Sequence, residues 1–157
     1  VQVPDHDVEG GSPPAYLAEL LAKGSDWLAF AKSNENRPAA EQIQFSVGIG
    51  KSYFLNIALL RAFRLLWANI LKSYELPFGK LAAVHSYVLF EDAEMDTNTQ
   101  IIYATTQAMA AVLGGSSSVR IWPRVAGDER SFVQHIVRNL QHLFLWKTRT
   151  EKTEPTK

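Results

Sequence analysis

The chain has 157 residues, of which 46% are hydrophobic and 20% charged, a composition typical of one globular domain with a substantial core. Its 16 basic and 16 acidic residues cancel, which argues against a large nucleic-acid-binding surface, and the lack of cysteine excludes disulfides, thiolate metal sites and cysteine nucleophiles. No apolar run reaches about 18 residues without a charge, and the first residues lack a signal-peptide pattern. We therefore expect a cytoplasmic protein without a membrane span.

The first segment, residues 1–13, is acidic and rich in turn formers, which predicts an extended arm. A helix is expected to begin at Pro13 with Ser12 as its N-cap, and to end in the segment 34–38. Gly24 lies inside this helical pattern and is expected to break or kink it. The predicted apolar stripe of this helix consists of Tyr16, Leu17, Leu20, Leu21, Trp27, Leu28 and Phe30.

The central segment, residues 42–75, predicts one βα unit. A short apolar run from Ile43 to Ile49 has the length and branching of a strand, and a long helical pattern follows it. Gly48 and Gly50 form G-x-G without a third glycine, so we interpret them as a tight strand-to-helix turn rather than a dinucleotide-binding loop. The expected apolar face of the helix is Phe54, Ile57, Ala58, Leu60, Phe63, Leu66, Trp67, Ile70 and Leu71.

The second predicted βα unit follows a turn at 76–79. Residues 81–90 form a nearly continuous apolar strand, as in buried parallel sheets. Asp96 or Thr97 is expected to cap a helix over 98–113, which Gly114 and Gly115 end. The residues expected to point inward are Ile101, Ile102, Thr105, Met109, Val112 and Leu113.

The third predicted βα unit has a short strand over 117–122 and a final helix from Glu129 to about Lys147, capped by Asp128. Its expected apolar face is Phe132, Val133, Ile136, Val137, Leu140, Leu143 and Phe144. Residues 148–157 are charged and poor in apolar side chains, which predicts a flexible tail.

This order, a helix followed by three βα units over residues 14–147, predicts an α/β fold with a parallel sheet and right-handed crossovers. A parallel sheet needs helices on both faces or closure into a barrel, and three strands alone expose two edges. We therefore predict a part of a larger α/β assembly, completed by further sequence or by another chain.

Three groups of residues raise the possibility of a metal or acid–base site. These are Asp5, His6 and Asp7 on the arm, the acidic loop over 91–96, and His135 with His142 on the last helix. Each group lacks the additional ligands or phosphate-binding loop that such a site requires. We therefore interpret all three as solvated surface and predict no metal site.

Three segments carry a resemblance to a known family. They are F-S-V-G-I-G-K-S-Y-F-L-N-I-A-L-L-R-A-F-R-L-L-W at 45–67, A-M-A-A-V-L-G-G-S-S-S at 108–118, and R-N-L-Q at 138–141. In this order and spacing they resemble the methylmalonyl-CoA mutase family. The resemblance implies that the chain is three consecutive βα units from the C-terminal part of a TIM-type (β/α)8 substrate-binding barrel.

The chain departs from the family at the carboxyl ends of its strands, where barrel enzymes place their chemistry. Gln42 stands where catalytic members have an arginine, and residues 86–91 replace their Q-T-S-G-W-S run. Only Asp96 remains of D-P-Y-N-N, Tyr103 stands in the place of a following arginine, and residues 118–122 replace S-L-H-T-N. The resemblance therefore implies a retained framework with no catalytic residues, as in the non-catalytic small (β) subunit of a heterodimeric bacterial mutase.

This resemblance implies a structural role in an enzyme that isomerises methylmalonyl-CoA and succinyl-CoA. The expected partner is the catalytic large subunit, which would hold adenosylcobalamin, or a second copy of the chain; no cofactor is expected on this chain alone. A degenerate acyl-CoA pocket is an alternative, with Gln42, Phe45, Ser86 and Arg120 as substrate-binding residues chosen by position. In that pocket Arg120 would meet a phosphate or carboxylate, unless it pairs with the acidic loop. An unrelated, stand-alone α/β interaction module is a further alternative.

Overall fold

The computed structural model describes residues 12–33, 43–75, 82–89, 96–122 and 129–150. In chain order the elements are α1 (Pro13–Ser33), β1 (Gln44–Gly48), α3 (Tyr53–Ser73), β2 (Ala83–Leu89), α4 (Thr97–Leu113), β3 (Ser118–Trp122) and α5 (Glu129–Thr150). The predicted α/β order is confirmed, although α5 continues beyond Lys147 into the predicted tail. The predicted turn at 76–79, most of the arm and the rest of the tail lie outside the described residues.

The three strands form one parallel sheet in the order β1-β2-β3. Phe45 lies opposite Val84 across the first pair of strands, and Ser86 lies opposite Val119 across the second. Within the described part of the chain, the outer edges of β1 and β3 have no strand partner. The sheet is therefore a section of a larger parallel sheet or barrel wall rather than a closed unit.

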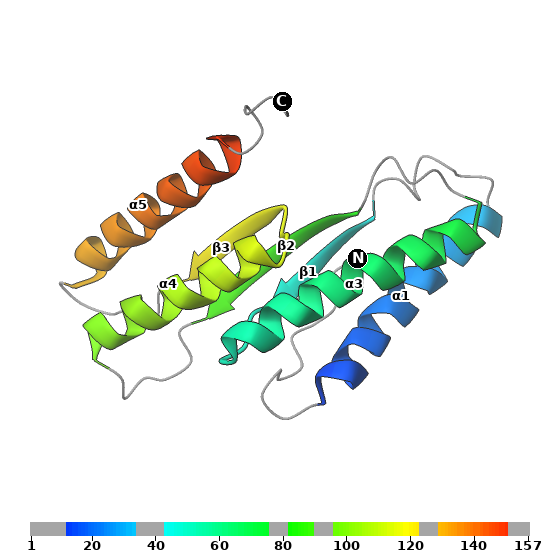
Figure 1. Ribbon diagram of the computed structural model, residues 1–157, viewed down its shortest axis with the longest axis horizontal. Coiled ribbons are helices and arrows are strands. Elements are labelled where there is room, and N and C mark those ends of the chain that lie inside the picture. Colours follow the sequence, from blue (N-terminus) through cyan, green and yellow to red (C-terminus); the bar gives the residue numbers. More distant parts are fainter. Residues whose placement is uncertain (1–11, 34–42, 76–81, 90–95, 123–128, 151–157) are drawn as a thin grey trace, which may run out of the picture.

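The helices form one layer against the sheet. Figure 1 shows α3 and α4 packed over the sheet and running along the direction of its strands, with α1 beside α3 and α5 beside α4. Their contacts agree with the view, since α4 touches α3, α5, β2 and β3. No described helix covers the opposite face of the sheet, where Gln44, Ser118 and Arg120 are exposed.

The core is built around an aromatic cluster of Phe45, Phe63 and Trp67, which join β1 to α3. The ring centroids of Phe45 lie 4.7 Å from those of both Phe63 and Trp67. Edge-to-face aromatic pairs of this kind add about 0.5–1.5 kcal/mol beyond the burial of their area. This cluster fixes the helix layer on the sheet.

Gly24 is a close-packing position, and the prediction that it breaks the first helix is wrong. Helix α1 continues through Gly24, which is buried. A Cβ atom added there would lie 2.6 Å from the Trp67 ring and 2.7 Å from the Phe45 ring. Glycine at this position lets α1 approach the aromatic cluster.

The predicted inward face of α4 is wrong for three of its six residues, whereas Ile101 packs against the core and Thr105 and Val112 are half-buried. Its buried residues are Ala104, Gln107, Ala108, Ala110 and Ala111, whereas the larger Ile102, Met109 and Leu113 are exposed. Helix α4 packs against α3, α5 and two strands, and four of its five buried side chains are alanines. In the same way Trp27, Phe30, Phe54, Leu66 and Phe132, all expected in the core, point outward.

Two arginines of α3 bind the carboxyl end of α4. Arg61 donates from Nη2 to the Leu113 carbonyl at 3.3 Å, and Arg64 donates to the Gly115 carbonyl. Burial lowers the pKa of Arg64 from its ordinary value, but a guanidinium remains charged in proteins. Gly115 has φ +91°, in the left-handed region that favours glycine, so the predicted Gly114–Gly115 helix end is confirmed. The arginines satisfy carbonyls that the helix leaves unpaired.

Helix α3 is also long and apolar enough, by length and composition alone, to cross a membrane. In the fold it is the central core helix, with Leu60, Phe63 and Trp67 buried and its two arginines bonded to the end of α4. The inner side of α3 packs in the core, whereas Phe54 and Leu65 on the same helix are exposed. The absence of a membrane span stays a prediction.

Replacing Gly24 with alanine tests the close packing. We expect Gly24→Ala to lower the free energy of unfolding by about 1–3 kcal/mol, because the new methyl group overlaps two buried rings. Urea denaturation measures this change. Ala22→Gly, at an exposed position of the same helix, gives the cost of glycine without overlap, about 1 kcal/mol. A stabilised Gly24→Ala protein would show that helix propensity outweighs packing here.

Replacing Arg64 tests the contact between α3 and α4. We expect Arg64→Leu to lower the free energy of unfolding by about 1.5–3 kcal/mol, because it removes a charged hydrogen bond to the Gly115 carbonyl. Lys72→Leu on the exposed side of the same helix should change it by less than about 0.5 kcal/mol. Equal effects of the two changes would contradict a specific role for Arg64.

Candidate functional site: the open face of the sheet

The candidate site is the face of the sheet that no described helix covers. Successive side chains of a strand point to opposite faces, so the register assigns Phe45, Val84 and Ser86 to the helix side. The open face carries Gln44, Ser46, His85, Tyr87, Ser118 and Arg120, which are exposed or half-buried. In parallel α/β folds ligands bind beyond the carboxyl ends of the strands. This polar surface is therefore the part of the described chain best suited to bind a ligand.

His85 lies at the middle of this face, on the central strand. Its Nδ1 lies 2.6 Å from the Ser118 Oγ on the neighbouring strand. Its Nε2 is buried and has no hydrogen-bond partner among the described residues. A serine nucleophile needs a histidine that a third polar group orients, and the described residues offer no such group to the other ring nitrogen of His85. The pair therefore joins two strands rather than forming a hydrolytic triad.

Of the four substrate-binding residues chosen from the sequence, the three that lie within the described residues do not come together. Arg120 lies on the open face opposite Tyr87 in the strand register. Phe45 is fully buried in the aromatic cluster, and Ser86 is buried on the helix side, where its Oγ lies 2.5 Å from the Ser116 Oγ. Gln42 lies outside the described residues. The structure thus places only Arg120 on the open face, and its binding to substrate stays a prediction.

His85, Tyr87 and Ser118 were missed by sequence reasoning. The signal that identifies them is the two-residue period of a strand, because the burial of Val84, Ser86 and Val88 places His85 and Tyr87 on the opposite face. Ser86 matches the family only by its position in a run of residues, and its two neighbours, His85 and Tyr87, are the residues that face the open side. Choosing by alternate positions would have found the open face.

The turn after β1 is held by buried amides. The Asn56 side chain accepts from the Gly50 amide at 3.1 Å and donates to the Gly50 carbonyl at 2.7 Å, and Gln107 donates to the same carbonyl at 3.2 Å. A phosphate-binding loop offers free backbone amides to its ligand, but the Gly50 amide is occupied here. The geometry supports the interpretation of G-x-G as a strand-to-helix turn.

Asp96 has a structural task at the start of α4. Its carboxylate accepts from the Thr99 hydroxyl at 2.5 Å and from the amides of Asn98 and Thr99. These hydrogen bonds, led by the Thr99 hydroxyl, lower the pKa of Asp96. The predicted cap is therefore confirmed. The rest of the acidic loop, and hence its predicted pairing with Arg120, lies outside the described residues.

The three groups that were considered and rejected as metal sites gain no support from the geometry. Across the described ranges, no three histidine, cysteine, aspartate or glutamate side chains gather as metal ligands. His135 and His142 are exposed on α5. Asp5, His6 and Asp7 lie outside those ranges.

Comparison with known proteins extends the sequence resemblance. Residues 8–149 match the family described as Methylmalonyl-CoA mutase. The chain belongs to the methylmalonyl-CoA mutase family. The family predicted from three motifs is thus confirmed, and a chance likeness of an unrelated module is excluded.

Individual members of the methylmalonyl-CoA mutase family show where the similarity lies. The chain is 33% identical to the methylmalonyl-CoA mutase small subunit of Porphyromonas gingivalis over 141 residues, which are 86% of this chain and 22% of that protein. It is 31% identical to the methylmalonyl-CoA mutase of Escherichia coli over 132 residues, 80% of this chain and 18% of that protein. It is 30% identical to a probable small subunit from Mycobacterium bovis over 115 residues, 68% of this chain and 19% of that protein. The chain spans about a fifth of the length of these relatives.

Proposed function

We propose that the chain is part of the small, non-catalytic subunit of an adenosylcobalamin-dependent methylmalonyl-CoA mutase, located in the cytoplasm. The observation that carries this proposal is the three-stranded parallel sheet, which has helices on one face and, within the described residues, no strand partner at either edge. Such a sheet cannot enclose a site by itself. Its role is to supply a section of barrel wall.

The described residues of this chain do not fit adenosylcobalamin. A histidine that binds cobalt needs an accessible ring nitrogen at the cofactor site, but His85 contacts Ser118 through Nδ1 and its Nε2 is buried. His135 and His142 are exposed, but they lie on α5 in the helix layer and not on the open face of the sheet. When bound, the cofactor supplies the radical for the isomerisation. We therefore propose that the large subunit holds it.

Activity measurements on separated and mixed subunits test the proposal. The chain alone should show no conversion of methylmalonyl-CoA to succinyl-CoA, because no described residues form a catalytic arrangement. Adding it to the cognate large subunit should give a complex in sedimentation velocity and raise the thermal midpoint of that subunit, since binding to the folded state stabilises it. An equal concentration of an unrelated protein is the control. Turnover by the chain alone, or the absence of any complex, would overturn the proposal.

The open face supports a second candidate function, the binding of an acyl-CoA. Arg120, at the middle of β3, and Tyr87, in the second half of β2, are register partners and lie side by side on the open face. A guanidinium suits the phosphates of coenzyme A, and a tyrosine can donate a hydrogen bond to a thioester carbonyl. This arrangement supports binding of an acyl-CoA by the open face without catalysis.

Calorimetry with CoA esters tests this second function. We expect binding that weakens about ten- to a hundredfold in Arg120→Ala, because one charged hydrogen bond is worth about 1.5–3 kcal/mol. Arg138→Ala, at an exposed arginine of α5, is the matched control and should leave the affinity unchanged. No heat of binding with the unaltered chain, or equal loss in the two variants, would exclude an acyl-CoA site on the open face.

A further inference from the structure

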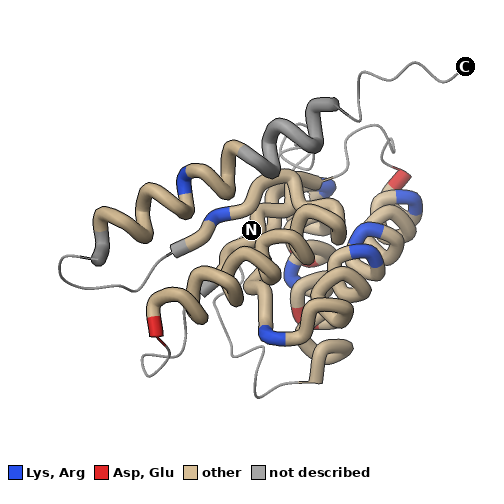
Figure 2. Tube along the Cα trace, turned by 60° about the vertical axis from the view of Figure 1, so that its left-hand side comes forward, with Lys and Arg blue, Asp and Glu red and all other residues tan. Residues whose placement is uncertain are grey.

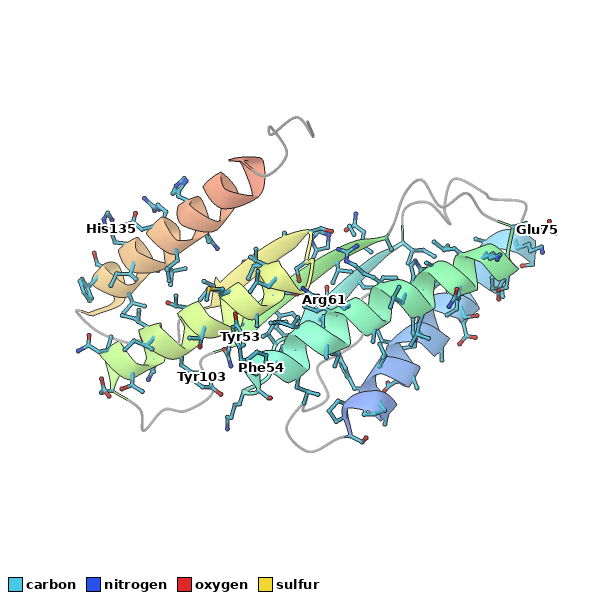
Figure 3. All side chains as sticks on the ribbon, in the orientation of Figure 1. Tyr53, Phe54, Arg61, Glu75, Tyr103 and His135 are labelled. Carbon is cyan, nitrogen blue, oxygen red and sulfur yellow. The ribbon has the colours of Figure 1, made fainter. Side chains whose placement is uncertain are left out.

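We draw no further inference here: the strongest candidate, the outer side of α3 and α4, where Phe54 and Ile102 are exposed and α4 has no charged residue (Figure 2 and Figure 3), carries no proposal because nothing in the structure shows what covers it.

Discussion

The structure depends on how closely three helices approach one face of a narrow sheet. Gly24 lets α1 reach the rings of Phe45 and Trp67, and an added Cβ at Gly114 would lie 2.6 Å from a methyl carbon of Leu60. Alanines line the inner side of α4 for the same reason. Because interiors are packed at nearly crystalline density, such positions accept small residues only. The large side chains of α4 are left on its outer side as a consequence.

Close packing also buries backbone polar groups, which then need hydrogen-bond partners. The carboxyl end of α4 approaches α3, and Arg61 and Arg64 donate to its carbonyls. In the turn after β1, the Asn56 side chain binds both the amide and the carbonyl of Gly50, and Gln107 donates to the same carbonyl. Unpaired buried polar groups are costly, so the arginines and amides are part of the packing itself. This explains why arginines occur within an otherwise apolar core helix.

The sequence predicted the elements well because their signals are local. The apolar period, Asp96 before α4 and the glycines after it identified a helix and both its ends. The sequence predicted less well which side of a helix is buried, because the buried side of α4 is set by neighbours far away in the chain. Ile102 and Met109 were expected inside on hydrophobicity alone, but burial there is decided by available space. The same holds for Ser86, whose burial depends on the register of three strands.

The family resemblance and the structure answer different questions about function. The resemblance identified the barrel framework through residues that pack, such as Phe45, Trp67 and Gly114, and it could not show which side chains reach the open face. The structure shows that the polar open face of the sheet and the uncharged outer side of α4 lie on opposite sides of the two layers that the sheet and the helices form. The open face is fixed by strand alternation, so it follows from the fold of a barrel wall. The outer face does not follow from that fold, because a solvated barrel helix would tolerate charge at Ile102, Thr106 and Met109. The apolar outer side of α4 is therefore a feature that the packing of the described residues does not require.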